Sequence, residues 1–109
     1  MKAFERLALP STLVLKNRLL KAAMEENMAT VKQEPGDEIF NLYEAWAKGG
    51  AAAIITGNVM IDPLAMTGPA GISLHAESDL RPFVKWATVS KQNDTKIIMQ
   101  INHPGRQTY

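Results

Sequence analysis

The sequence predicts a parallel α/β fold, because two helical segments alternate with three short apolar segments along the chain. Residues 38–48 carry apolar side chains at helical spacing. Residues 51–56 and 96–101 are almost wholly apolar, without the alternation of a strand that has one face in water. The order strand, helix, strand, helix, strand corresponds to two consecutive βαβ units.

The first strand is predicted within residues 19–24, which read L-L-K-A-A-M. An earlier apolar run, residues 13–15, is separated from it by the polar turn Lys16-Asn17-Arg18. Residues 25–36 are polar and end in Pro35-Gly36, so a loop is expected there. We expect the run 19–24 to be a buried strand.

The first helix is predicted over about residues 38–48. Asp37 is placed as its N-cap, and Glu38 lies in the first turn, where the helix dipole favours an acidic side chain. Gly49-Gly50 supplies the C-terminal stop. The apolar positions are Ile39, Leu42, Tyr43, Trp46 and Ala47.

The second half of the chain repeats this order. Residues 51–56 are predicted as a strand, and residues 57–77 as a long loop rich in glycine and proline. Asp79 is expected to cap a second helix with Pro82 in its first turn, and Asn93-Asp94 to end it. Residues 96–101 form the third strand. The inner face of the second helix is assigned to Phe83, Trp86, Ala87 and Ser90.

Composition narrows the function classes. The net charge of +1 gives no electrostatic reason to expect nucleic acid or an anionic membrane as a partner. There is no cysteine, which excludes disulfides and thiolate catalysis. His75 and His103 lie in different loops without an adjoining carboxylate cluster, so no metal site is expected. With no apolar signal core and no membrane-spanning stretch, a soluble cytoplasmic protein is predicted.

Three strands cannot close a barrel, since a complete (β/α)₈ barrel needs roughly 250 residues. The apolar strands would have exposed edges, which favour aggregation. We therefore expect either the remainder of a barrel or pairing with another chain in a homo-oligomer. The first alternative is favoured, because the chain ends where a loop at the carboxyl end of the third strand begins, which is the catalytic face of such barrels.

Four stretches together resemble the N-terminal part of the Old Yellow Enzyme family, the FMN-dependent NADH:flavin oxidoreductases and ene-reductases. Each motif is weak alone, but four in the right order at the spacing of two βαβ units are fairly specific. The resemblance covers nearly all of this chain and about the first third of a family member. The stretches are Leu15-Lys16-Asn17-Arg18 followed by A-A-M, Tyr43-x-x-Trp46-Ala47-x-Gly49-Gly50, Ile54-Ile55-Thr56-Gly57, and Gln100-Ile101-Asn102-His103-Pro104-Gly105-Arg106.

The resemblance implies an incomplete (β/α)₈ barrel, its first three strands and two helices, with FMN across the carboxyl ends of the strands. It places Ala23, Met24 and Glu25 beside the flavin at the end of the first strand. It places Gly57 and Asn58 at the end of the second strand. Gln100, on the third strand, would hydrogen-bond the pyrimidine edge of the flavin, since a carboxamide can both donate and accept. His103 and Arg106 would lie on the loop above, near the substrate or the phosphate.

Two positions depart from the family pattern. Ala23 stands where the family usually has proline, and Glu25 where a small residue, cysteine or threonine tunes the flavin. A carboxylate close to the flavin would disfavour the anionic reduced form and lower its potential. We therefore expect that Glu25 points away, that its neighbour Glu26 does, or that a cation compensates.

The activity that the resemblance implies is hydride transfer from NAD(P)H through FMN to a small-molecule substrate, an acceptor such as an activated alkene. The family's substrate-binding pair, its tyrosine proton donor and its phosphate-binding residues lie on later strands, beyond residues 1–109. Catalysis by these residues alone is therefore expected to be weak or absent. The alternative is a catalytically inactive fragment that self-associates or serves as a structural or interaction module.

Overall fold

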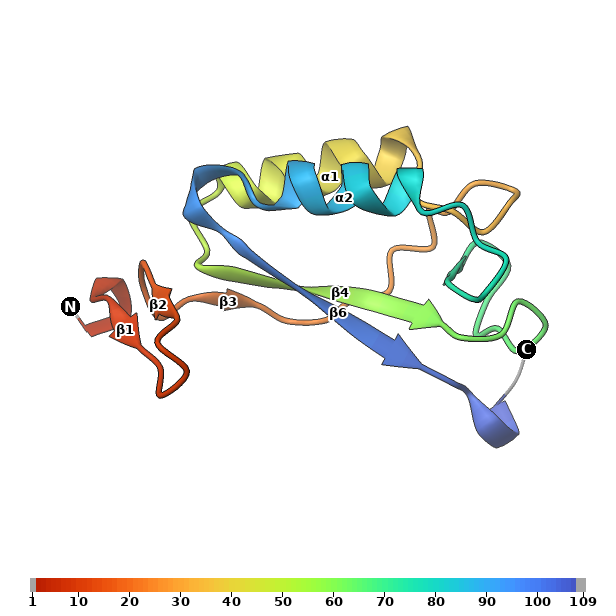
Figure 1. Cartoon of the computed structure of the whole chain (residues 1–109), viewed down its shortest axis with the longest axis horizontal. Helices are drawn as coiled ribbons and strands as arrows, with labels where there is room; N and C mark the ends of the chain where they lie inside the picture. The colour runs from red at the N-terminus through yellow and green to blue at the C-terminus, as the bar shows by residue number, and fades with distance from the viewer. Residues whose placement is uncertain (1, 108–109) are drawn as a thin grey trace.

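The computed structural model describes residues 2–107 and shows two helices lying on one face of a parallel sheet (Figure 1). The helices form one layer and the sheet forms the other, and β4 and β6 are the long strands of the sheet. This confirms the predicted alternation of strands and helices. The helices are α1 (Asp37–Lys48) and α2 (Arg81–Ser90), and the strands of the sheet are β3 (Leu20–Lys21), β4 (Ala53–Met60), β5 (Ile72–Ser73) and β6 (Lys96–Asn102).

Strand β4 is the centre of this sheet. It pairs in parallel with β6 along one side, and with β3 and then β5 along the other. Because all of these pairs are parallel, the carboxyl ends of β4 and β6 lie at the same end of the sheet, on the right of Figure 1. Ligands bind at this end in parallel α/β folds.

Helix α1 matches its predicted span, but its N-cap is Gly36 and not Asp37. Gly36 has the extended backbone of an N-cap, and Asp37 lies in the first turn, where its charge suits the helix dipole. The predicted glycine stop is confirmed. The Gly49 N–H donates to the carbonyl of Trp46 at 3.1 Å, and Gly50 follows with φ of +107°.

Helix α2 begins one residue later than predicted, because its N-cap is Leu80 rather than Asp79. The Asp79 carboxylate still accepts the N–H of Arg81 at 3.0 Å. It also pairs with the Arg81 guanidinium at 2.8 Å, and these contacts lower the pKa of Asp79 to about 2. The helix ends at Ser90, so Asn93 and Asp94 lie in the following 3₁₀ turn η2 (Gln92–Asp94) and do not end it.

The core lies between the two helices and the sheet. Tyr43 is fully buried at its centre and contacts Trp86 edge to face, with ring centroids 5.2 Å apart. Trp46 also contacts the Tyr43 ring edge to face, with ring centroids 4.9 Å apart. The buried residues of this cluster are Ile39, Phe40, Tyr43, Ala47, Ile54, Val59, Ile72, Phe83 and Trp86.

Two predicted elements differ from the structure. The first strand is short and exposed, with Leu20 at 49% exposure, because the N-terminal hairpin covers the sheet face opposite the helices only in part. The predicted loop 57–77 is wrong in part, since β4 continues to Met60 and β5 lies within it. The polar turn before β3 has the expected structural role. Asn17 donates to the Gly50 carbonyl at 2.7 Å and accepts the Leu19 N–H at 3.0 Å.

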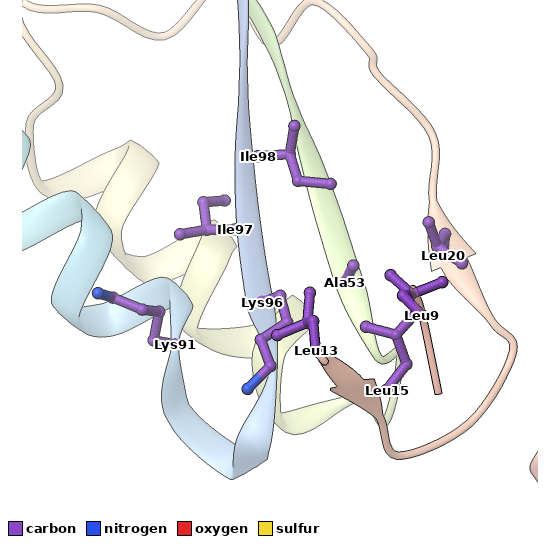
Figure 2. A pocket seen from close by; sticks show the side chains of 9 residues that line it. All are labelled: Leu9, Leu13, Leu15, Leu20, Ala53, Lys91, Lys96, Ile97 and Ile98. Atoms are coloured by element: carbon purple, nitrogen blue, oxygen red, sulfur yellow. The ribbon is translucent and has the colours of Figure 1, made fainter. Parts of the chain in front are cut away.

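The face of the sheet opposite the helices is apolar near the amino ends of the strands. An antiparallel hairpin of β1 (Leu7–Ala8) and β2 (Val14–Leu15) lies there, after the 3₁₀ turn η1 (Lys2–Phe4). Between hairpin and sheet is a cavity of about 390 Å³ (Figure 2). It is lined by Leu9, Leu13, Leu15, Leu20, Ala53, Lys91, Lys96, Ile97 and Ile98.

Candidate functional site

A β-bulge lies near the carboxyl end of β4. The pairing with β6 shifts register between Ile55 and Asn58, so that Thr56 and Gly57 together oppose one residue of β6. The Thr56 hydroxyl donates to the Gly57 carbonyl at 2.8 Å and accepts the Gln100 N–H at 3.0 Å. Such a bulge re-aims the side chains that follow it, and here Asn58 reaches the side chain of Gln100.

Beyond the bulge, polar side chains from three segments form one hydrogen-bonded network. The amide oxygen of Asn58 accepts from the Gln100 carboxamide and, at 3.1 Å, from that of Asn102. The Asn58 amide in turn donates to Glu25 at 3.4 Å. The hydroxyl of Thr67, in the loop between β4 and β5, donates to the same Glu25 oxygen. The network therefore joins the loop after β3 to the carboxyl ends of β4 and β6.

A second cluster lies behind this network, between the sheet and α1. The Tyr43 hydroxyl donates to Oε2 of Glu26, and the Gly57 N–H lies 3.2 Å from the same carboxylate oxygen and 3.3 Å from the Tyr43 oxygen. Burial, with the neighbouring Glu26 carboxylate adding to it, raises the pKa of Tyr43 far above its usual value. The phenol therefore stays protonated and available as a donor to Glu26.

The segment that carries both glutamates lies directly against Gly57. A Cβ on Gly57 would lie 2.4 Å from the Met24 carbonyl oxygen, 2.8 Å from a Glu26 carboxylate oxygen and 3.1 Å from Cα of Glu25. Real Cβ contacts are not this short, so the approach requires glycine. Gly57 was predicted at the second strand end, and it lies inside β4, at the bulge.

The other predicted positions are distributed as follows. Ala23 is half-buried and Met24 is 60% exposed, both in the segment after β3. His103 is exposed, and its Nδ1 accepts the Gly105 N–H at 3.0 Å. Arg106 is exposed in the 3₁₀ turn η3 (Gly105–Gln107). Within residues 2–107, no hydrogen bond joins His103 or Arg106 to the network of Glu25, Asn58 and Gln100.

Sequence reasoning missed five members of these clusters. The glycine inside an apolar strand was a usable signal, because an isolated glycine in a strand often marks a bulge or a close approach of another segment. The side-chain partners themselves come from separate parts of the chain, and no local pattern pairs them. The missed members are Glu26 and Tyr43 as partners, Thr56, Thr67 and Asn102.

Metal binding and membrane insertion were also considered in the sequence, and the structure bears on both over residues 2–107. Residues 2–107 contain no group of three or more histidine, cysteine, aspartate or glutamate side chains able to hold a metal ion. No helix among them is long and apolar enough to cross a membrane.

The sequence matches the NADH:flavin oxidoreductase / NADH oxidase family over residues 2–109. The chain belongs to this family. It is 39% identical over 99 residues to an NADH-dependent flavin oxidoreductase of Hypocrea jecorina, an alignment that covers 87% of this chain and 25% of the relative. It is 32% identical over 97 residues to an NADH oxidase of Thermoanaerobacter brockii, with 88% of this chain and 15% of that protein covered. The chain thus spans about a quarter or less of these curated relatives.

Solved structures place this member of the flavin oxidoreductase family in the (β/α)₈ barrel fold. The old yellow enzyme from Trypanosoma cruzi superposes with a TM-score of 0.86 at 22% identity, covering 98% of this chain and 28% of that one. A 2-naphthoyl-CoA reductase superposes with a TM-score of 0.85 at 25% identity, covering 99% of this chain and 16% of that one. The resemblance and the predicted fold, a portion of such a barrel, are thereby confirmed.

Proposed function

We propose that residues 1–109 form the N-terminal portion of the barrel of an FMN-dependent NAD(P)H oxidoreductase of the ene-reductase type. The proposed reaction takes a hydride from NAD(P)H and delivers it to an acceptor such as an activated alkene. Membership of the flavin oxidoreductase family supports this, as does the NADH dependence stated for the relative from Hypocrea jecorina. FMN, when bound, supplies the hydride-carrying N5 atom.

The main support for the proposal is that three carboxamide side chains contact one another at the carboxyl ends of β4 and β6. Gln100, Asn58 and Asn102 are joined through the Asn58 oxygen. Carboxamides fit the pyrimidine edge of a flavin, which presents donors and acceptors on adjacent atoms. In this proposal Asn58 orients the Gln100 carboxamide, which binds that edge.

The remaining proposed contacts come from the segment after β3 and from the loop after β6. Ala23, Met24 and Glu25 would border the ring, with the close approach at Gly57 fixing their distance from the sheet. The Glu25 carboxylate is held by hydroxyl and amide donors, so its charge is partly offset without a neighbouring cation. His103 and Arg106 would lie on the substrate or phosphate side.

The apolar face of the sheet supports the remainder of a barrel as the structural partner. Leu20 is 49% exposed and Ile98 is 47% exposed there, beside the cavity of Figure 2. In a closed barrel such side chains fill the interior. The competing proposal is the inactive fragment, in which a second copy of the chain covers this face in a homo-oligomer.

The test uses the protein expressed from its complete reading frame. We expect bound FMN, seen by its visible absorbance, and NADH or NADPH oxidation when an activated alkene is added. Gln100→Ala should weaken FMN binding about tenfold, as expected for loss of one or two hydrogen bonds. Gln92→Ala is the matched control, since Gln92 precedes β6 and contacts Glu44 on α1, away from the carboxyl ends of the strands. A colourless oligomer without oxidoreductase activity would instead support the inactive fragment.

A further inference from the structure

The amide of Gly57 is directed out of the sheet at the bulge. Its hydrogen-bond acceptors are the Glu26 carboxylate and the Tyr43 hydroxyl, at 3.2 and 3.3 Å. We propose that Glu26 is a positioning residue, which fixes the segment Met24–Glu25 against the bulge of β4 by binding Tyr43 and Gly57 together. This rests on the proposed function, because that segment is the one proposed to border the flavin.

The β-bulge of β4 changes where the N–H of Gly57 can find a hydrogen-bond acceptor. A residue inside a strand normally gives its N–H to the neighbouring strand, but the register shift between Ile55 and Asn58 interrupts this ladder. A buried N–H without an acceptor would cost on the order of 1–3 kcal/mol. Gly57 is buried, and Glu26 reaches its amide from a loop 31 residues earlier in the chain. Glu26 thus satisfies a donor that the bulge releases.

Tyr43, the other hydrogen-bond partner of Glu26, is held rigidly in the core. Tyr43 has no exposed surface, and its ring contacts both Trp46 and Trp86 in the core. Its hydroxyl is therefore a fixed point on α1 from which Glu26 is held. The backbone from Met24 to Glu26 then has little conformational freedom, because the Met24 carbonyl oxygen and the Glu25 Cα already lie close to Gly57.

The anchoring of Glu26 also decides on which side of the segment the adjacent Glu25 lies. With Glu26 held on the helix side, Glu25 lies on the opposite side, where it meets Thr67 and Asn58. The two neighbouring carboxylates therefore have separate tasks. Glu26 anchors the segment, and Glu25 faces the mouth of the strands.

The experiment measures local and global opening separately in the protein expressed from its complete reading frame. Hydrogen exchange is followed for peptides covering residues 22–30 and 54–60, and urea unfolding gives the overall stability. The variants are Tyr43→Phe, Glu26→Ala, their combination, and Glu26→Gln, which keeps an acceptor oxygen. Glu38→Ala is the matched control, since Glu38 is an exposed acid on α1. FMN affinity is measured on the same proteins.

We expect Tyr43→Phe and Glu26→Ala to speed exchange in residues 22–30 about tenfold more than their global stabilities explain. The combined variant should be no worse than Glu26→Ala, and Glu26→Gln should remain near wild type. FMN affinity should fall in the same order.

Exchange that rises only in proportion to global unfolding, or single effects that simply add, would overturn the positioning role. If wild-type protein binds no FMN, the proposed function fails, while the exchange data still decide whether Glu26 holds the segment.

Discussion

Replacing Gly57 by alanine tests the close approach between the segment after β3 and strand β4. The added methyl would lie 2.4 Å from the Met24 carbonyl oxygen and 3.1 Å from Cα of Glu25, and both are backbone atoms that cannot rotate away. Overpacking of this kind costs about 1–3 kcal/mol. Alanine also reduces the freedom of the unfolded chain, which stabilises by about 0.4–1 kcal/mol. We expect the free energy of unfolding to fall by roughly 1–2 kcal/mol.

Urea unfolding followed by tryptophan fluorescence measures this loss, and a thermal scan should show a lower Tm than that of the wild type. Gly68→Ala is the matched control. Its Cβ would meet Asn27 Oδ1 at 3.6 Å, an ordinary contact, so its stability should stay near wild type or rise slightly. If Gly57→Ala is as stable as Gly68→Ala, the segment does not press on the strand as the structure shows, and the positioning argument loses its basis.

Three further changes have defined outcomes. Asn17→Ala should lower the free energy of unfolding by about 1–3 kcal/mol in urea, because a nearly buried side chain that bonds the Gly50 carbonyl at 2.7 Å is lost. The folded-state pKa of Asp79, about 2, lies below its ordinary 3.8, so its stabilisation is present above pH 4 and is lost as pH falls toward 2. Asp79→Asn should flatten that part of the acid unfolding curve, and an unchanged slope would show that its pairing with Arg81 adds no stability. Glu25→Thr should raise the flavin midpoint potential, measured by dye-coupled reduction; an unchanged potential would mean that the carboxylate does not face the ring.

Much of the fold could be predicted because its long elements carry strong patterns. The helical spacing of apolar residues in α1 and the apolar run of β6 gave both elements within one or two residues of their ends. The cap residues were less predictable. The N-caps Gly36 and Leu80 make no side-chain hydrogen bond. The neighbouring aspartates, which are favoured cap residues, were therefore predicted as N-caps in their place. The exposure of β3 depends on what covers its face, which no local pattern reports.

The candidate site was predicted in part for a related reason. Glu25, Asn58 and Gln100 were each proposed from motifs, and the structure joins them in one network. That arrangement depends on the bulge in β4, which shifts the side-chain alternation by one residue. Simple alternation from Ile55 would have put Asn58 on the helix side of the sheet. Predicting the second strand to end at Thr56 hid this feature, because the glycine that marks the bulge was assigned to a loop.

The bulge also explains how two acidic neighbours can occupy the segment that is proposed to border the flavin. At sequence level, Glu25 and Glu26 are one polar pair, and a charge beside the flavin was a difficulty for the resemblance. In the structure Glu26 is drawn to the opposite side by the Tyr43 hydroxyl and the Gly57 amide. Of these two carboxylates, Glu25 is therefore the one nearer the proposed flavin edge, and Thr67 and Asn58 donate hydrogen bonds to it. A threonine in the following loop thus places a hydroxyl close to the position where the family pattern carries one at residue 25 itself.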